Sequence, residues 1–244
     1  MPQLGLVGNL SHDRVDGAAP RLGGGVFHGA GALKLLERPA EIIARGALLE
    51  PIPLPARVLP ARETTAFSFR YEGDTRVMEV DALGEVWVED DVASLEAEWV
   101  HLAALIRSDF PGETIAALAR DRTLSLDGQA LVRAPVLGPL RLDRNFDPRV
   151  LEEISILKLS EEEADVLDGV ELGVPEVIVT RGARGSVVLT DGHASEIPAS
   201  PLGGVDPTGA GDAFAVGYLA ARSEGRGPAE AAREATELVA RFLS

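Results

Sequence analysis

The sequence has no cysteine and four histidines among its 244 residues. Without cysteine the chain cannot form a disulfide framework or a thiolate zinc site. The histidines are scattered and show no metal-ligand spacing, so we expect no structural zinc. An internal repeat and a low-complexity tract are also missing.

Basic residues are in the minority, with 23 Lys+Arg against 39 Asp+Glu and a formal net charge of −16. Such a surface repels nucleic-acid phosphates and anionic lipids, so we expect neither a nucleic acid nor a membrane as partner. A small molecule is the expected ligand. An anionic nucleotide would be held by backbone N–H groups and a metal ion rather than by a basic surface.

Long apolar runs are missing too, and no segment has the apolar length needed to span a bilayer. The segment Met1 to Leu10 has no basic region and only a short apolar run, so we expect no signal peptide and a cytoplasmic protein. The hydrophobic fraction of 45% and the charged fraction of 25% are those of a globular protein. We expect residues 1–244 to form one domain.

Strand-like and helical segments alternate along the chain, which predicts βαβ units and a mostly parallel sheet covered by helices. Four prolines between Pro51 and Pro60 predict an extended connection. A β-hairpin is expected at about 64–81 around Glu72-Gly73-Asp74, and a second hairpin at 186–197 at a sheet edge. The expected strands are 4–9, 41–44, 99–102, 123–126, 154–158 and 176–180, and the expected helices are 30–36, 113–119, 161–167, 209–223 and 228–243.

The strongest motif is Val205-Asp206-Pro207-Thr208-Gly209-Ala210-Gly211-Asp212-Ala213-Phe214. Gly209 and Gly211 let a phosphate approach the main chain, and a helix starting there aims N–H groups at the anion. Asp212, in the first helical turn, would face an acceptor hydroxyl and take its proton. The alternative is an ordinary helix start with glycines for the turn and an Asp that complements the dipole. That alternative does not account for the whole run.

The segment 205–214 resembles the C-terminal signature of the ribokinase-like, or pfkB, carbohydrate kinase family, and other segments along nearly the whole chain agree. The resemblance implies a three-layer α/β/α sandwich with a mostly parallel sheet and a β lid. It also implies an ATP-dependent kinase that phosphorylates a hydroxyl of a sugar or polyol, including an inositol, with Mg²⁺ bridging the phosphates. By this resemblance Asp212 is the base, and the amides of Gly209, Ala210 and Gly211 bind the transferred group.

The N-terminal third resembles the substrate side of that family. Asp13, after the first strand, is similar to the family's aspartate that binds substrate hydroxyls, although a loop aspartate that bonds its own backbone is the alternative. Gly23-Gly24-Gly25 resembles the substrate-site diglycine, and His28 stands where the family frequently has asparagine. The segment 126–133 is similar to an Asp-x-Gln-Gly motif and makes Arg133 a candidate, with a solvated arginine as the alternative. The substrate-binding candidates are Asp13, Gly24, Gly25, His28 and Arg133.

Thr180-Arg181-Gly182-Ala183-Arg184-Gly185 resembles the family's nucleotide-binding turn. Thr180, Gly182, Gly185 and Thr208 are therefore the candidates for binding the nucleotide. The two glycines could instead only shape a turn between strands.

The segment 158–163 resembles the family's Asn-x-x-Glu motif, with Ser160 in place of asparagine. By this resemblance Glu163 supports Mg²⁺ through water, and Asp206 with Thr208 is a candidate site for K⁺. Ser160 and Glu163 also have the spacing of a capping box, and the two roles can coexist.

The segment between Gly31 and Thr64 is short compared with the family, and the hairpin at about 64–81 is the clear candidate for a lid. We therefore expect a small or reduced lid. Lids of this family often mediate dimerisation, so a homodimer is one of the oligomeric states left open. Two other functions stay open. Phe27, Phe67 and Phe69 could stack on the base of a nucleoside, or the chain could be a catalytically silent ligand sensor.

Overall fold

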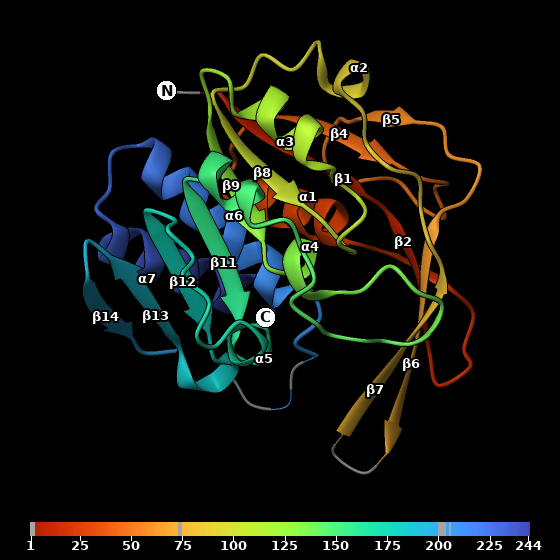
Figure 1. Ribbon diagram of the computed structural model, residues 1–244. Helices are drawn as coiled ribbons and strands as arrows, with labels where there is room; N and C mark the ends of the chain where they lie inside the picture. The colour runs from red at the N-terminus through yellow and green to blue at the C-terminus, as the bar shows by residue number, and fades with distance from the viewer. Residues whose placement is uncertain (1–2, 73–74, 200–203, 205) are drawn as a thin grey trace.

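The computed structural model describes residues 3–72, 75–199, 204 and 206–244. Its centre is a nine-stranded sheet of order β14-β13-β12-β11-β9-β8-β1-β4-β5, parallel except where β13 and β14 join one edge (Figure 1). The predicted mostly parallel sheet is confirmed. Its strands are β1 (Leu4–Asn9), β4 (Ala40–Arg45), β5 (Arg57–Leu59), β8 (Trp99–Ala103), β9 (Thr123–Asp127), β11 (Ile156–Ser160), β12 (Glu176–Thr180), β13 (Ser186–Thr190) and β14 (His193–Ile197).

Helices cover both faces of this sheet, because alternate strand residues are apolar on each side. Leu6 of β1 belongs to one buried cluster and Val7 to another. Among the described residues, none of the helices combines the length and apolar character needed to cross a bilayer. One face carries α1 (Gly25–Leu35), α6 (Ala210–Ser223) and α7 (Pro228–Phe242); the other carries α2 (Glu89–Val92), α3 (Gly112–Ala119), α4 (Gln129–Val132), α5 (Glu161–Val166) and the 3₁₀ helix η1 (Pro148–Glu153). The three-layer α/β/α architecture is confirmed.

A second sheet of five strands, in the order β10-β7-β6-β2-β3, forms the lid. The expected hairpin is present as β6 (Thr65–Glu72) and β7 (Thr75–Ala82), which project from the body of the protein (Figure 1). Its turn at 73–74 lies outside the described residues. The lid is larger than this hairpin, because β2 (Ser11–Val15), β3 (Arg21–Gly23) and β10 (Gly138–Pro139) extend it.

Three local expectations needed correction. Asp13 is not a loop aspartate, because Ser11 to Asp13 form a strand that pairs with β3 and β6 and has alternating buried and half-buried side chains. Helix α1 begins at Gly25 and not near Ala30. Its N-cap residue is Gly24, whose φ of 95° is a conformation that favours glycine. The proline-rich connection contains β5, which pairs with the end of β4.

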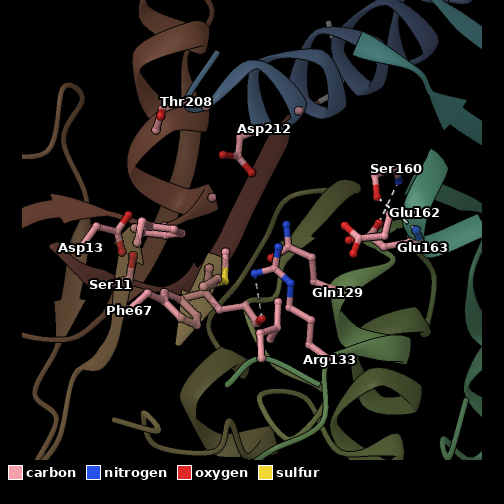
Figure 2. Close-up of a pocket in the computed structure, with 18 of the residues that line it drawn as sticks. Ser11, Asp13, Phe67, Gln129, Arg133, Ser160, Glu162, Glu163, Thr208 and Asp212 are labelled. Atoms are coloured by element: carbon pink, nitrogen blue, oxygen red, sulfur yellow. Dashed lines mark hydrogen bonds between the residues drawn. The ribbon is translucent and has the colours of Figure 1, made fainter. Parts of the chain in front are cut away.

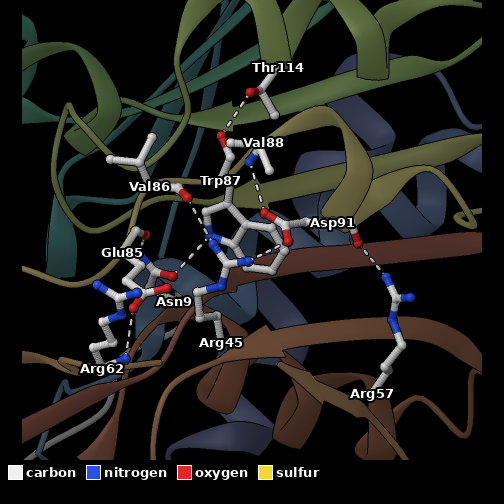
Figure 3. A network of polar contacts seen from close by, with 10 residues as sticks. All are labelled: Asn9, Arg45, Arg57, Arg62, Glu85, Val86, Trp87, Val88, Asp91 and Thr114. Atoms are coloured by element: carbon white, nitrogen blue, oxygen red, sulfur yellow. Dashed lines mark hydrogen bonds and ion pairs between the residues drawn. The ribbon is translucent and has the colours of Figure 1, made fainter. Parts of the chain in front are cut away.

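A network of polar contacts fixes the segment around Trp87 against β1 and β4 (Figure 3). The buried indole donates a 2.9 Å hydrogen bond from Nε1 to Asn9 Oδ1 and stacks on Phe110. Arg45 lies 4.7 Å above the indole ring, donates to the Val86 carbonyl and pairs with Asp91 at 2.5 Å. These contacts hold the connection that links the lid to the central sheet.

Asp109 gives the protein a pH-dependent stability. This side chain is 2% exposed and accepts hydrogen bonds from the Leu105 and Ile106 amides at 2.7 and 3.2 Å. Burial raises the pKa of its carboxyl from 3.8 to about 6. The folded protein thus binds this proton more tightly than the unfolded chain, and the stability it contributes is full below pH 3.8 and lost as the pH rises through 6.

We expect Asp109 to account for about 2 kcal/mol of lost stability between pH 4 and pH 7. Urea unfolding of the wild type and of Asp109→Asn at several pH values measures this contribution as a difference between the two curves. Asparagine keeps an acceptor oxygen but does not titrate. Equal pH dependence of the two proteins would contradict the prediction.

Candidate active site

A cavity of about 660 Å³ opens where the carboxyl ends of the central strands, the start of α6 and the lid meet (Figure 2). The structure brings most of the predicted site residues together around it, although they come from distant parts of the sequence. Of the predicted residues, those lining the cavity are Asp13, Gly24, Gly25, His28, Arg133, Glu163, Thr180, Gly182, Thr208, Gly209, Gly211 and Asp212.

Asp212 and the start of α6 form the centre of the site. Gly209 has φ 80°, a left-handed conformation that favours glycine, and its carbonyl accepts the first hydrogen bond of the helix, from Ala213. The amides of Gly211 and Asp212 lie in the first turn, where an α-helix supplies no acceptor. An anion placed there meets both these donors and the positive end of the helix dipole.

The N–H of Ala210, a predicted phosphate donor, has a partner within the protein. Its N–H donates a 3.1 Å hydrogen bond to the Pro207 carbonyl, which closes the turn before the helix. The protein's own backbone therefore occupies this donor. The amides that follow it in the first turn are those of Gly211 and Asp212.

The carboxylate of Asp212 points into the cavity (Figure 2). Burial raises its pKa above the ordinary aspartate value, and nearby Asp127 raises it further, whereas His28 and Lys158 lower it. A raised pKa makes the carboxylate a stronger base than a solvated aspartate. Such a group can accept the proton of an alcohol while the alcohol oxygen forms a new bond.

Gly25 keeps the space beside Asp212 open. A Cβ atom at this position would lie 2.9 Å from Asp212 Oδ1 and 2.9 Å from the Ala103 methyl group. The predicted role of Gly25 in the site thus has a steric basis, because any side chain here displaces the carboxylate.

We expect Gly25→Ala to lower kcat by about 10- to 100-fold, because small displacements of a reacting group are costly. Steady-state turnover with the preferred acceptor measures the effect. Gly227→Ala is the matched control, because a Cβ atom there meets nothing within 4 Å. Wild-type turnover by Gly25→Ala would contradict the proposed packing of the base.

The lid and β9–β11 side of the cavity have the features of a substrate site. Asp13 lies on β2, 7% exposed, with its carboxylate packed against Gly23. Gln129 and Arg133 face it from α4 across the cavity (Figure 2). Polar groups on two walls with apolar lid residues above them suit a compact polyhydroxyl ligand. The apolar lid residues are Phe67, Phe69, Val77, Met78 and Leu140.

His28 lines the cavity and also packs against the turn before α6. A Cβ atom at position 209 would lie 2.7 Å from its ring, so the ring packs directly against Gly209. It also makes an edge contact with Phe27 at 5.4 Å. Glycine is required at 209 both for the backbone angle and for this close approach.

Glu163 forms the predicted capping box and also lies at the cavity wall. The capping box is present, with Ser160 N–H donating to Glu163 Oε2 at 2.8 Å and Glu163 N–H donating to Ser160 Oγ at 3.2 Å. Glu163 also lines the cavity beside Glu162 (Figure 2). Among the described residues, no three His, Cys, Asp or Glu side chains form a metal cluster. Glu162 and Glu163 place two carboxylates at the cavity wall, and Mg²⁺ takes one or two carboxylates together with water and phosphates.

The nucleotide candidates lie at the end of β12 and in the 3₁₀ helix η2 (Gly182–Arg184). Thr180 Oγ1 donates to the Leu159 carbonyl at 3.1 Å, which leaves its hydroxyl at the cavity wall. Gly185 lines an adjoining cavity of about 320 Å³ and has φ 86°. A Cβ atom there would lie 2.0 Å from the Ile197 carbonyl, so the turn itself needs this glycine.

Three predicted residues lie outside the lining of the main cavity: Gly185 and Ala210, which line the adjoining cavity, and Asp206. Asp206 Oδ1 accepts hydrogen bonds from the Thr208 N–H and hydroxyl at 3.0 and 2.6 Å, and its Oδ2 lies 3.8 Å from Arg21. These contacts join the segment before α6 to strand β3 of the lid.

The sequence did not point to several residues that line the cavity. Ser11 and Glu162 lie close in sequence to predicted residues, and the strand period or helix position could have found them. Gln129 is the glutamine of the segment that resembles Asp-x-Gln-Gly, but it was not a candidate. Lys158, two residues before Ser160, also lies at the cavity wall. Its role depends on partners in other strands, which no local pattern reveals.

A three-layer α/β sandwich with a second β sheet beside the carboxyl ends of its strands, and a carboxylate at the start of α6, define an α/β protein of the ribokinase fold. The sequence profile of the pfkB family carbohydrate kinases matches residues 61–240, and the chain belongs to this family.

The chain is 31% identical to an inositol 3-kinase of Oryza sativa subsp. japonica over 186 residues, 67% of this chain and 46% of the relative. Matches to the rice protein and to the inositol 3-kinase of Zea mays span less than half of those relatives' length. A pyrophosphate-dependent kinase in the ribokinase family, complexed with a pyrophosphate analog and myo-inositol, superposes with TM-score 0.87 at 23% identity, covering 99% of this chain and 95% of that one. A Burkholderia thailandensis nucleoside kinase in complex with inosine gives TM-score 0.74 at 19% identity, covering 97% and 89%.

Proposed function

We propose that this protein is an ATP-dependent kinase that transfers the γ-phosphoryl group to a hydroxyl of a sugar or polyol, with an inositol as the first candidate. The observation that carries the proposal is the Asp212 carboxylate, which faces a polar cavity directly beside the first-turn amides of α6. Family membership and the inositol 3-kinase relatives support the choice of acceptor.

In the proposed reaction the acceptor hydroxyl lies between Asp13 and Asp212. Asp212 accepts its proton while the hydroxyl oxygen bonds to the γ-phosphorus, and the bond from that phosphorus to the β,γ-bridging oxygen breaks to release ADP. The Gly211 and Asp212 amides stabilise the charge on the group in transit. When bound, Mg²⁺ neutralises phosphate charge, and Glu163 would hold it through water.

The donor is a distinct part of the proposal. The adjoining 320 Å³ cavity shares Thr180, Gly182 and Gly211 with the main cavity and is lined further on by Phe214, Val239 and Leu243. An apolar extension next to a phosphate site suits a nucleoside, which inorganic pyrophosphate lacks. It supports ATP as the donor, although one structural neighbour is pyrophosphate-dependent.

The proposal is tested by incubating the protein and Mg²⁺ with ATP or pyrophosphate and a panel of inositols, sugars and nucleosides. Product formation from ATP and a polyol supports it. A preference for nucleosides would favour the second candidate, which rests on Phe67 and Phe69 lining the cavity. Binding without ADP release across the panel would instead favour a ligand sensor.

Three finer points belong to the same proposal. Asp206 and Thr208 are the proposed ligands of K⁺, which a comparison of activity in potassium and tetramethylammonium salts tests. A homodimer formed through the lid is tested by light scattering. A cytoplasmic location fits the use of ATP as donor.

A further inference from the structure

Lysine is rare in this chain, which has two lysines, Lys34 and Lys158, and 21 arginines. Lys34 is exposed on α1, whereas Lys158 is 5% exposed on β11. A buried ammonium group is costly unless it is paired and hydrogen-bonded. Lysine differs from arginine in carrying a compact charge on a flexible stem, a property used in phosphate binding. A buried lysine at this position therefore indicates a functional role.

A row of buried polar side chains holds Lys158 in place. Lys158 Nζ donates to Asp127 Oδ1 at 2.9 Å, and Asp127 Oδ2 lies 3.2 Å from His101 Nε2. The other ring nitrogen of His101 lies 3.0 Å from Ser125 Oγ. Lys158 is the cross-strand partner of Asp127, and His101 is that of Ser125, so the row crosses β11, β9 and β8 on the face toward α6.

The row ends at the anion-binding amides. A Cβ atom at Gly211 would lie 3.0 Å from Lys158 Nζ, which places the ammonium group directly beside the first turn of α6. An ammonium group has three N–H donors, and one of them goes to Asp127. Burial lowers the pKa of Lys158, but Asp127, Glu163 and Asp212 together raise it above the ordinary lysine value. The group therefore stays charged.

The charge balance of the cavity strengthens this point. Among its described lining residues, lysine and arginine occur at Lys158 and Arg133, against the carboxylates of Asp13, Glu162, Glu163 and Asp212. A polyanionic donor entering such a cavity needs a fixed positive charge next to the transferred group. Lys158 is the cation next to α6, whereas Arg133 lies near the Leu105 carbonyl on the side of α4.

We propose that Lys158 is a further catalytic residue, which donates hydrogen bonds to the non-bridging oxygens of the phosphoryl group in transit, and that Asp127 and His101 position it. The inference rests on the proposed kinase function. Lys158 keeps its proton throughout, because Asp212 accepts the hydroxyl proton and ADP leaves with the electron pair of the broken P–O bond. The ammonium group acts through its charge and its N–H donors, without transferring a proton.

The kinetic test compares Lys158→Met with wild type and with Lys34→Met, the same change at the exposed lysine. We expect kcat to fall by about 10²- to 10³-fold in Lys158→Met, with a smaller change in the KM for the acceptor, and no change in Lys34→Met. The double variant Asp127→Asn/Lys158→Met removes both buried charges and guards against misfolding. If Lys158 only neutralises Asp127, this double variant recovers near-wild-type turnover, and the inference is overturned.

A second readout does not depend on turnover. In Lys34→Arg protein labelled at lysine Cε with ¹³C, the remaining signal is that of Lys158. We expect this signal to shift when the β,γ-imido analogue of ATP and Mg²⁺ are added, and to stay in place when adenosine is added. An unchanged signal at saturating analogue would overturn the role of Lys158. A wild-type protein inactive on the whole panel would contradict the kinase proposal, while the shift would still report on phosphate contact.

Discussion

Replacing Asp212 with asparagine is expected to lower kcat by about 10²- to 10⁴-fold while the fold is kept, because general-base assistance typically contributes this much. Asparagine has nearly the same shape as aspartate but cannot accept the hydroxyl proton at neutral pH. The side chain lies in the first turn of α6 and lines the cavity, so the change leaves the packing of the helix face intact. Initial rates of ADP formation measure the effect.

Asp168→Asn is a suitable control, because it makes the same chemical change at an exposed position after α5. Circular dichroism and a binding assay with the ATP analogue would show whether the Asp212 variant stays folded and binds its donor. Turnover at the wild-type rate would mean that another group takes the proton, and the assignment of the base would be wrong.

The second large effect is expected at Trp87, where substitution by alanine should cost about 3–5 kcal/mol of stability. The indole is fully buried, stacks on Phe110, supports the Arg45 guanidinium and donates to Asn9. All of these contacts are lost together, and a domain of this kind has only about 5–15 kcal/mol to lose. Urea unfolding followed by circular dichroism gives the change in free energy.

Two further variants separate the contributions at this position. Trp87→Phe keeps an aromatic ring against Phe110 but loses the hydrogen bond to Asn9, for which we expect about 1–2 kcal/mol. Val88→Ala alters an exposed neighbour and should change stability by less than about 0.5 kcal/mol. A loss below about 1 kcal/mol in Trp87→Ala would show that the network in Figure 3 does not hold this segment.

The sequence was most informative where function depends on contiguous residues. The turn at Gly209, the helix start and Asp212 are all encoded within a few positions, so their local chemistry predicted a phosphate site before any fold was known. The alternation of strands and helices likewise predicted the layers and the mostly parallel sheet. Local hydrogen bonding also allowed the capping box at Ser160 to be predicted.

Features built from distant segments were not predictable in this way. The strand Ser11–Val15 was not among the predicted strands because its cavity-facing residues Ser11 and Asp13 are hydrophilic, and its pairing with β3 and β6 involves distant segments. The pairing of Lys158 with Asp127 was not predictable, because the two residues are 31 positions apart in the sequence. The occupied N–H of Ala210 depends on the exact geometry of the preceding turn.

The make-up of the lid has a consequence for protein engineering. Its strands come from the separate segments 11–15, 21–23, 65–82 and 138–139, and β3 is followed within two residues by α1. No single cassette can therefore be exchanged with a homologue to transplant a new acceptor preference. Variation of this scaffold has to proceed through individual substitutions on the inner surface of these strands, each compatible with the segment that follows it.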